Sequence, residues 1–315
     1  MKFLLPVLMI CLFSSSVFAS VEAGNAAYNR KNYATALAEY RKAADQGNAE
    51  ALNQLGLMYF KGEGTARDVK KALDFFEKSA NAGYAPAQAT LGNIYFDGIE
   101  LVLEKDTKKG LEWLNKAANG GYGPAQEDLG TLYVQGTKVK RDLSLGAKWM
   151  EKAASTGLPN AQMTFALMNL NGEGIAKNPK AAFDWMQKAA TQGHPVAQDY
   201  LGMFYVEGIG TAENLKMAID WFTKAAKQNY ASAQINLGII YLSDDSGTHK
   251  NLQQGANWIK KAADAGSIPA QKIMAQLYYE GRGVRKDMNM VRSYLTKAAN
   301  AGDAEAKKML EDLKK

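Results

Sequence analysis

Side chains that commonly do chemistry are scarce in this chain. Its 315 residues include one cysteine, Cys11, and two histidines, His194 and His249. A single cysteine cannot form an internal disulfide or a zinc site with several cysteine ligands, and two histidines offer little for a histidine-based metal site or triad. Asp244 and Asp245 lie near His249 but are far too few for a calcium site. We therefore expect no catalytic residues, no metal site and no cofactor.

Glycine-rich loops are the next candidate, because such loops can cradle phosphate groups. Gly-x-Gly sequences begin at Gly62, Gly172, Gly208 and Gly281. No predicted strand precedes them, they lack the lysine and serine of a P-loop, and they recur at the same point of a repeat. We predict that they are turns. The sequence also lacks the Gly-x-Ser-x-Gly and His-Glu-x-x-His motifs of hydrolases and metalloproteases.

The aromatic residues follow a fixed spacing. All five tryptophans stand three residues before the lysine of a Lys-Ala-Ala triplet: Trp113, Trp149, Trp185, Trp221 and Trp258. A stacking platform for nucleic acid or sugar is one interpretation. We favour another, because an aromatic residue at one phase of every repeat is typical of a side chain that packs neighbouring helices together. The net charge of +6 comes without a basic stripe, so we expect no nucleic-acid partner.

Two sequence patterns repeat in phase along the chain. The lysine of the Lys-Ala-Ala triplet recurs every 36 to 38 residues, at Lys42, Lys78, Lys116, Lys152, Lys188, Lys224, Lys261 and Lys297, and the only departure is Ser79 in place of the first alanine. The pattern Ala-x-x-x-Leu-Gly-x-x-Tyr begins at Ala51, Ala87, Ala125, Ala161, Ala197, Ala233 and Ala270. Glycines that can adopt a left-handed conformation close both segments. Each repeat is therefore predicted to contain two helices.

These patterns strongly resemble the Sel-1-like repeat, a relative of the tetratricopeptide repeat. The resemblance implies an all-α, right-handed superhelical solenoid. We expect repeats at 49–84, 85–122, 123–158, 159–194, 195–230, 231–267 and 268–303, a tetratricopeptide-like capping unit at 20–48 and a polar C-terminal cap at 304–315.

The first residues have the pattern of an export signal. Lys2 precedes an apolar run from Phe3 to Phe13, and Ala19 ends a stretch of small residues. We predict a signal peptide at 1–19, which implies a periplasmic or secreted protein. The apolar run is too short to span a bilayer, so we expect no transmembrane segment. We also expect the chain to be a monomer.

Variable positions of the first helix of each repeat are candidates for binding. With the first alanine of the pattern as position 0, positions 0, 4, 5, 7, 8 and 9 form one arc that we expect to be buried. Positions 2, 3, 6 and 10 vary and are expected to face an open, concave groove. The candidate site there consists of Glu127, Asp128, Met163, Leu167, Asp199, Tyr200, Met203, Ile235 and Ile239. Exposed apolar patches often mark partner sites; packing against the adjacent repeat is the competing interpretation.

Together these observations predict a non-catalytic, periplasmic scaffold that binds another protein through its concave groove. The resemblance implies partners such as toxic effectors, envelope enzymes or host-cell components, so the protein could be an immunity protein, a virulence factor or a regulator of envelope enzymes. Two alternatives stay open. One is a cell-wall or β-lactam-binding hydrolase, although the secreted relatives with that activity carry disulfides. The other is glycan binding through Tyr200 and Phe204.

Overall fold

The computed structural model describes residues 21–243 and 250–313, and in them it contains helices and no β-sheet. The predicted signal peptide at 1–19 lies outside the described residues. The chain divides into two compact units at Leu158 and Pro159. Beyond a helical stretch at 21–29, the first unit contains α2 (Tyr33–Ala44), α3 (Ala49–Lys61), α4 (Val69–Asn81), α5 (Ala85–Asp97), α6 (Thr107–Asn119), α7 (Gly123–Gln135) and α8 (Leu143–Ser155).

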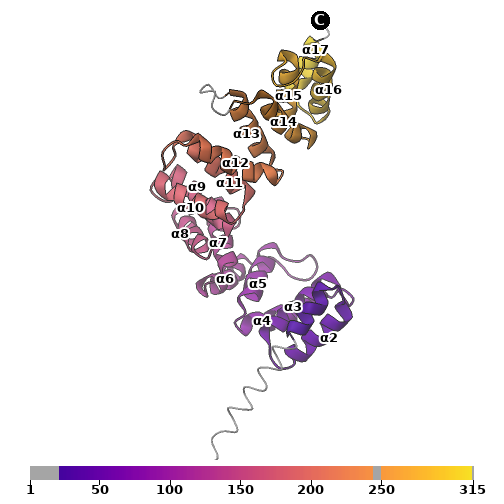
Figure 1. Cartoon of the computed structure of the whole chain (residues 1–315). Helices are drawn as coiled ribbons and strands as arrows, with labels where there is room; N and C mark the ends of the chain where they lie inside the picture. The colour runs from indigo at the N-terminus through magenta and orange to yellow at the C-terminus, as the bar shows by residue number, and fades with distance from the viewer. Residues whose placement is uncertain (1–20, 244–249, 314–315) are drawn as a thin grey trace, which may run out of the picture. The chain divides into compact units, whose positions relative to one another are not determined.

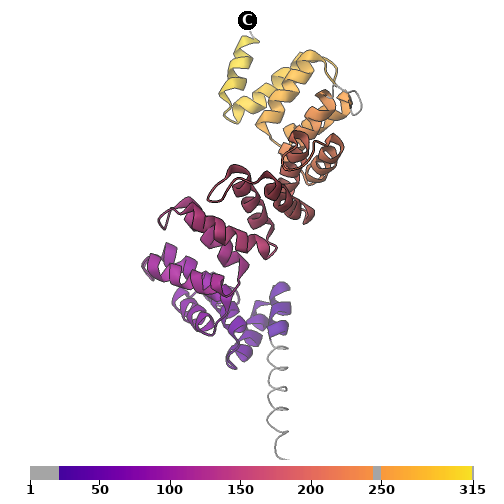
Figure 2. The same ribbon diagram turned by 90° about the vertical axis from the view of Figure 1, so that its left-hand side faces the viewer.

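The second unit continues with the same arrangement. It contains α9 (Pro159–Asn171), α10 (Pro179–Thr191), α11 (Pro195–Glu207), α12 (Leu215–Lys227), α13 (Ala231–Ser243), α14 (Leu252–Asp264), α15 (Ile268–Glu280), α16 (Met288–Asn300) and α17 (Ala304–Asp312). The most extensive contacts join α3 to α4, α5 to α6 and so on to α15 and α16, and these partners lie side by side in Figures 1 and 2. The all-α array of helix pairs predicted from the repeats is confirmed.

In each helix pair, a capping residue fixes the start of the second helix; these second helices are the even-numbered ones from α4 to α16. These caps are Asp68, Asp106, Asp142, Asn178, Asn214, Asn251 and Asp287. Each side chain accepts a hydrogen bond from a backbone N–H of the first turn at 2.9 to 3.2 Å. The N–H of the cap itself donates to the carbonyl of position 8 in the first helix, at 2.8 to 3.2 Å. One residue therefore starts the second helix and ties it to the first.

The five tryptophans that precede the Lys-Ala-Ala lysines, here called the aromatic column, pack as the repeat pattern predicts. Trp149 and Trp221 are buried, while Trp113, Trp185 and Trp258 are half-buried against apolar clusters. In each of these five helices the lysine of the Lys-Ala-Ala triplet lies over the indole ring, with Nζ 3.5 to 4.2 Å from the ring centroid. A lysine over an indole ring is a favourable cation–π arrangement. The lysine thus covers the part of the ring that packing leaves open.

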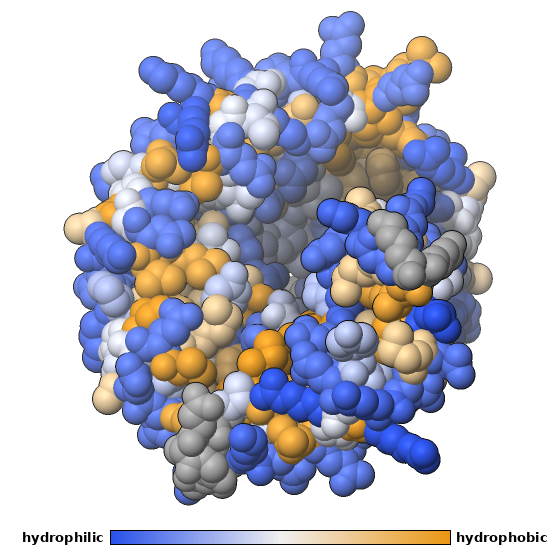
Figure 3. All heavy atoms as spheres, turned by 90° about the horizontal axis from the view of Figure 1, so that it is seen from above, coloured by the Kyte–Doolittle hydropathy of each residue, from blue (hydrophilic) through white to orange (hydrophobic). Residues whose placement is uncertain are grey.

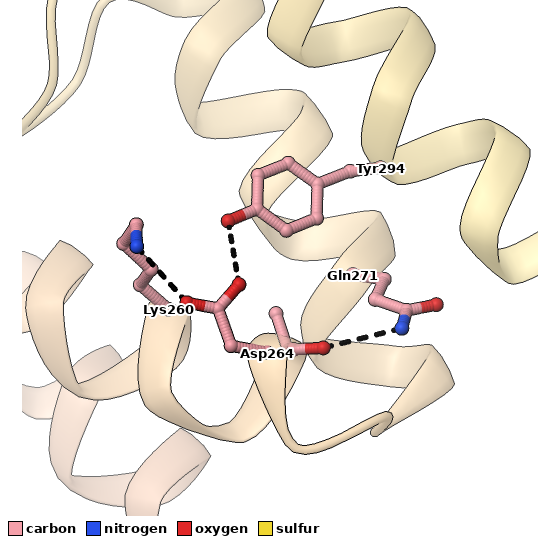
Figure 4. Close-up of polar contacts among 5 residues, drawn as sticks. Lys260, Asp264, Gln271 and Tyr294 are labelled. Atoms are coloured by element: carbon pink, nitrogen blue, oxygen red, sulfur yellow. Dashed lines mark hydrogen bonds and ion pairs between the residues drawn. The ribbon is translucent and has the colours of Figure 1, made fainter.

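Glutamines at position 1 of the first helix join consecutive pairs. The side-chain Nε2 of Gln88, Gln126, Gln198, Gln234 and Gln271 donates to a carbonyl near the end of the preceding second helix, at 2.9 to 3.2 Å. Figure 4 shows this bond for Gln271, beside the contacts that Asp264 makes with Lys260 and Tyr294. Each of these carbonyls also accepts from the N–H of the glycine or asparagine that closes the helix, so the glutamine is a second donor that joins two pairs.

Small residues let the two helices of a pair approach closely. Gly238 of α13 faces Gly255 and Ile259 of α14, and a Cβ at position 238 would lie 2.4 Å from Ile259 Cγ1 and 2.9 Å from the Gly255 carbonyl oxygen. Real Cβ atoms are not found at such distances from backbone or from buried branched side chains, so this crossing depends on glycine.

We therefore predict that Gly238→Ala lowers the free energy of unfolding by about 1–3 kcal/mol, because the added methyl forces the helices apart. Urea denaturation followed by circular dichroism measures this change. Asn257→Ala, on the exposed side of α14, is the control and should change stability by less than about 0.5 kcal/mol. Equal stability of Gly238→Ala and the control would show that the crossing is not tight.

Candidate functional site

Two of the predicted site residues lie in the first unit. Glu127 and Asp128, on α7, are both half-buried. Asp128 accepts a hydrogen bond from Asn93 of α5 at 3.1 Å. Burial and the nearby Asp128 carboxylate raise the pKa of Glu127. The other seven predicted residues belong to the second unit.

Four of the predicted apolar residues pack inside the second unit. Met163, Leu167 and Tyr200 are half-buried against the apolar cluster of α9 to α13. Ile235 is half-buried against the cluster formed by α13 to α17. Positions 2, 3 and 6 of the first helices therefore contribute to the packing of these clusters, position 6 through Leu167. For these residues the structure favours packing against the adjacent repeat, the competing interpretation of the sequence pattern.

Asp199 does not face open solvent, and the expectation that position 2 is open is wrong here. Its side chain is only 4% exposed. One carboxylate oxygen accepts a hydrogen bond from Nδ2 of Asn236 on α13 at 2.9 Å, and the Ser232 side chain is a second partner. Burial raises the pKa of this carboxyl group, although the two hydrogen bonds oppose the shift. Position 2 lies at the seam between consecutive first helices, so Asp199 joins α11 to α13.

The remaining two predicted residues are exposed. Met203 on α11 is 36% exposed, and Ile239 on α13 is 44% exposed. They occupy position 6 in consecutive repeats. Val206 is 40% exposed and lies three residues after Met203, so it shares that face of α11. The sequence analysis missed Val206 because position 9 belongs to the arc expected to be buried; its spacing from Met203 was the available signal.

Exposed apolar side chains of the described residues concentrate in the second unit. The large ones are Leu101, Met203, Val206, Ile239, Tyr279, Met288 and Met309. Four of these seven lie on α11, α13 and α15, which are the first helices of their pairs, and Met309 lies on α17, which follows the last pair. We call Met203, Val206 and Ile239 the α11–α13 surface. Figure 3 shows one face of the molecule, on which apolar atoms form separate groups among hydrophilic ones.

Groups that would bind a metal ion are not found in the described part of the chain: no three His, Cys, Asp or Glu residues cluster there. Residues 244–249, which contain Asp244, Asp245 and His249, lie outside it. None of the described helices combines the length and the apolar character needed to cross a bilayer.

Known proteins share this repeat. The family model of the Sel1 repeat matches residues 30–48, 49–84, 85–122, 123–158, 160–194, 195–230, 231–267 and 268–303. One similar solved structure is a protective antigen of uropathogenic Escherichia coli strains with an SLR fold. It is 30% identical with a TM-score of 0.81, and the match covers 98% of this chain and 67% of that one. No curated protein sequence matches significantly.

A second similar structure is a Sel1 repeat protein from Oxalobacter formigenes. It is 28% identical with a TM-score of 0.73, and the match covers 98% of this chain and 91% of that one. The matched repeats follow the helix pairs described above, from α3 and α4 to α15 and α16. This chain belongs to the Sel1 repeat family.

Proposed function

We propose that the protein is a non-catalytic scaffold that binds another protein, and that the α11–α13 surface is a contact site for that partner. The observation that carries the proposal is the exposure of Met203, Val206 and Ile239 on neighbouring first helices. Each of them exposes more than a third of its surface, whereas position 4 of the same helices is fully buried at Leu201 and Leu237.

The surroundings of this surface have the composition of a small protein interface. Its apolar residues share α11 and α13 with the polar residues Glu207, Asn236 and Ser243. Protein interfaces typically combine an apolar centre with a polar rim. Helix pairs stacked in an array present extended surfaces for binding other proteins.

We propose further that the protein is exported and acts in the periplasm or outside the cell. The apolar run and small residues of 1–19 support this, and so does the protective antigen among its E. coli relatives. In that compartment a scaffold of this kind could serve as an immunity protein, a virulence factor or a regulator of an envelope enzyme. The partner decides between these roles.

The function is tested with purified protein and a periplasmic extract of its own organism. We expect the unmodified chain to capture one protein, and Met203→Asp/Ile239→Asp to lose at least tenfold in affinity, because each carboxylate would be desolvated in the contact. The matched control is Asn257→Asp on α14, which should bind normally. Circular dichroism must show that the variants are folded. Equal capture by all three chains would contradict the proposed surface.

Asp199 lies one helical turn before Met203 on α11 and is hydrogen-bonded to Asn236 of α13. Its ionisation should affect the free energy of unfolding. Because burial raises its pKa in the folded state, the free energy of unfolding falls as pH rises from the ordinary aspartate pKa through the raised value. We predict that Asp199→Asn, which keeps an acceptor for Asn236, is about 1 kcal/mol more stable at pH 7. The difference should vanish below about pH 3, where the aspartate is neutral in both the folded and the unfolded chain. Urea denaturation at several pH values measures it; a variant less stable at pH 7 would show that the carboxylate is favourable.

A further inference from the structure

A cleft of about 650 Å³ in the first unit is lined by an excess of basic side chains. Arg41, Arg67, Lys70 and Lys71 line it and are exposed, and Asp68 is the one acidic residue of the lining. The Asp68 carboxylate caps α4 and accepts a hydrogen bond from the backbone N–H of Lys71 at 3.0 Å. The cleft therefore contains more positive charge than its own acidic group can neutralise.

The four basic side chains have neutral partners. None of them forms an ion pair with an acidic side chain of the described residues, whereas other lysines of the first unit do, at Lys42, Lys61, Lys78, Lys109 and Lys138. Arg41 Nη2 donates to the hydroxyl of Tyr59 at 2.6 Å, and Arg67 Nε donates to the Phe60 carbonyl at 3.0 Å. Lys71 Nζ lies 4.5 Å from the centroid of the Tyr59 ring. These contacts leave the positive charges uncompensated.

Tyr59 brings a hydroxyl to the cleft from a buried position. The residue is 4% exposed, and its ring stacks on Phe75 with the ring centroids 5.5 Å apart. Its oxygen accepts from Arg41, but its own O–H finds no acceptor among the residues that the structure describes. Burial would raise the pKa of Tyr59, yet the hydrogen bonds and charges of Lys71 and Arg41 outweigh burial and lower it. The cleft therefore stabilises negative charge beside this hydroxyl.

The next repeat shows what an acid does at the same place. Glu77 stands directly before Lys78, as Arg41 stands directly before the lysine of its own repeat. Tyr95, at the position of Tyr59, donates its O–H to Glu77 at 3.4 Å. In the cleft a cation replaces that carboxylate, so the O–H of Tyr59 is left for an acceptor from outside the chain.

The donors fit a group with three acceptor oxygens. The O–H of Tyr59, the N–H groups of Arg41 that Tyr59 does not use and the Lys71 ammonium group meet at one place. A phosphate monoester offers three free oxygens and a charge of about −1.5 to −2 near neutral pH. A carboxylate offers two oxygens and a single charge. Four basic side chains against one acidic side chain favour the more highly charged group.

We propose that this cleft binds a phosphate monoester, carried by a small molecule or by a lipid headgroup. Tyr59, Arg41 and Lys71 donate to its three oxygens, and Arg67 and Lys70 add positive charge. The site lies in the first unit and does not depend on the function proposed for the α11–α13 surface.

The test uses the purified protein near neutral pH and one probe for each source. For a small molecule, NMR chemical shifts follow a titration with phenyl phosphate, and benzoate is the matched carboxylate. For a lipid, sedimentation measures binding to vesicles that contain phosphatidic acid, a monoester, or the same fraction of phosphatidylglycerol, a diester. We expect saturable binding of the monoester in at least one arm, at least tenfold tighter than its counterpart. Binding to phenyl phosphate without vesicle binding assigns a soluble ligand, and vesicle binding assigns a lipid.

Variants locate the binding. Arg41→Glu reproduces the acid of the next repeat and should weaken binding at least tenfold. Tyr59→Phe keeps the stacked ring but removes the O–H, and should weaken binding about fivefold. The matched control is Lys216→Glu, the same charge change at the second residue of α12, where α4 has Lys70; it should bind normally. Circular dichroism checks folding, and Tyr59→Phe serves as the test if Arg41→Glu unfolds.

Three results would overturn the proposal. They are no saturable binding in either arm, binding of benzoate and phosphatidylglycerol as tight as that of the monoesters, and equal loss of affinity in the control variant. None of these variants changes the α11–α13 surface, so failure here would leave the function proposed for that surface untouched.

Discussion

One hydrogen bond closes every helix pair from α3 and α4 to α15 and α16: the N–H of the residue that caps the second helix donates to a carbonyl of the first. The rest of the array depends on this bond, because it sets where the second helix starts relative to its partner. Glutamines at position 1 then join five pairs to the pairs before them. An isolated pair could not bury its apolar face, so stability comes from stacking.

This construction decides which surfaces are free to bind. On the second helices from α6 to α14, lysines lie over the tryptophan rings and cover the largest apolar side chains. On the first helices, position 2 is taken up where neighbouring repeats meet, as Asp199 shows. At position 6, Met203 and Ile239 remain exposed, whereas Leu167 packs against the apolar cluster of α9 to α13. The α11–α13 surface is a place where first helices of the second unit keep apolar side chains in solvent.

The repeat pattern was sufficient to predict the helices, because periodic alanines, closing glycines and the aromatic column are local signals. The candidate site was only partly predictable. The repeat positions of Asp199 and Met203 vary equally from repeat to repeat. Their exposure differs because Asn236 of the next repeat contacts Asp199, and no local pattern reveals that contact. Val206 was missed for the same reason, since position 9 is buried in α13 at Leu242 and open in α11.

The central claim is that the first helices of the second unit contact a partner while the second helices do not. Site-specific photo-crosslinking in living cells tests it most directly, with a photoreactive amino acid placed in turn at Met203, Ile239 and, on the second helix α14, Asn257. We expect a crosslinked product of the same mass from positions 203 and 239 and none from position 257. A product from position 257 alone, or none from either first-helix position, would contradict it.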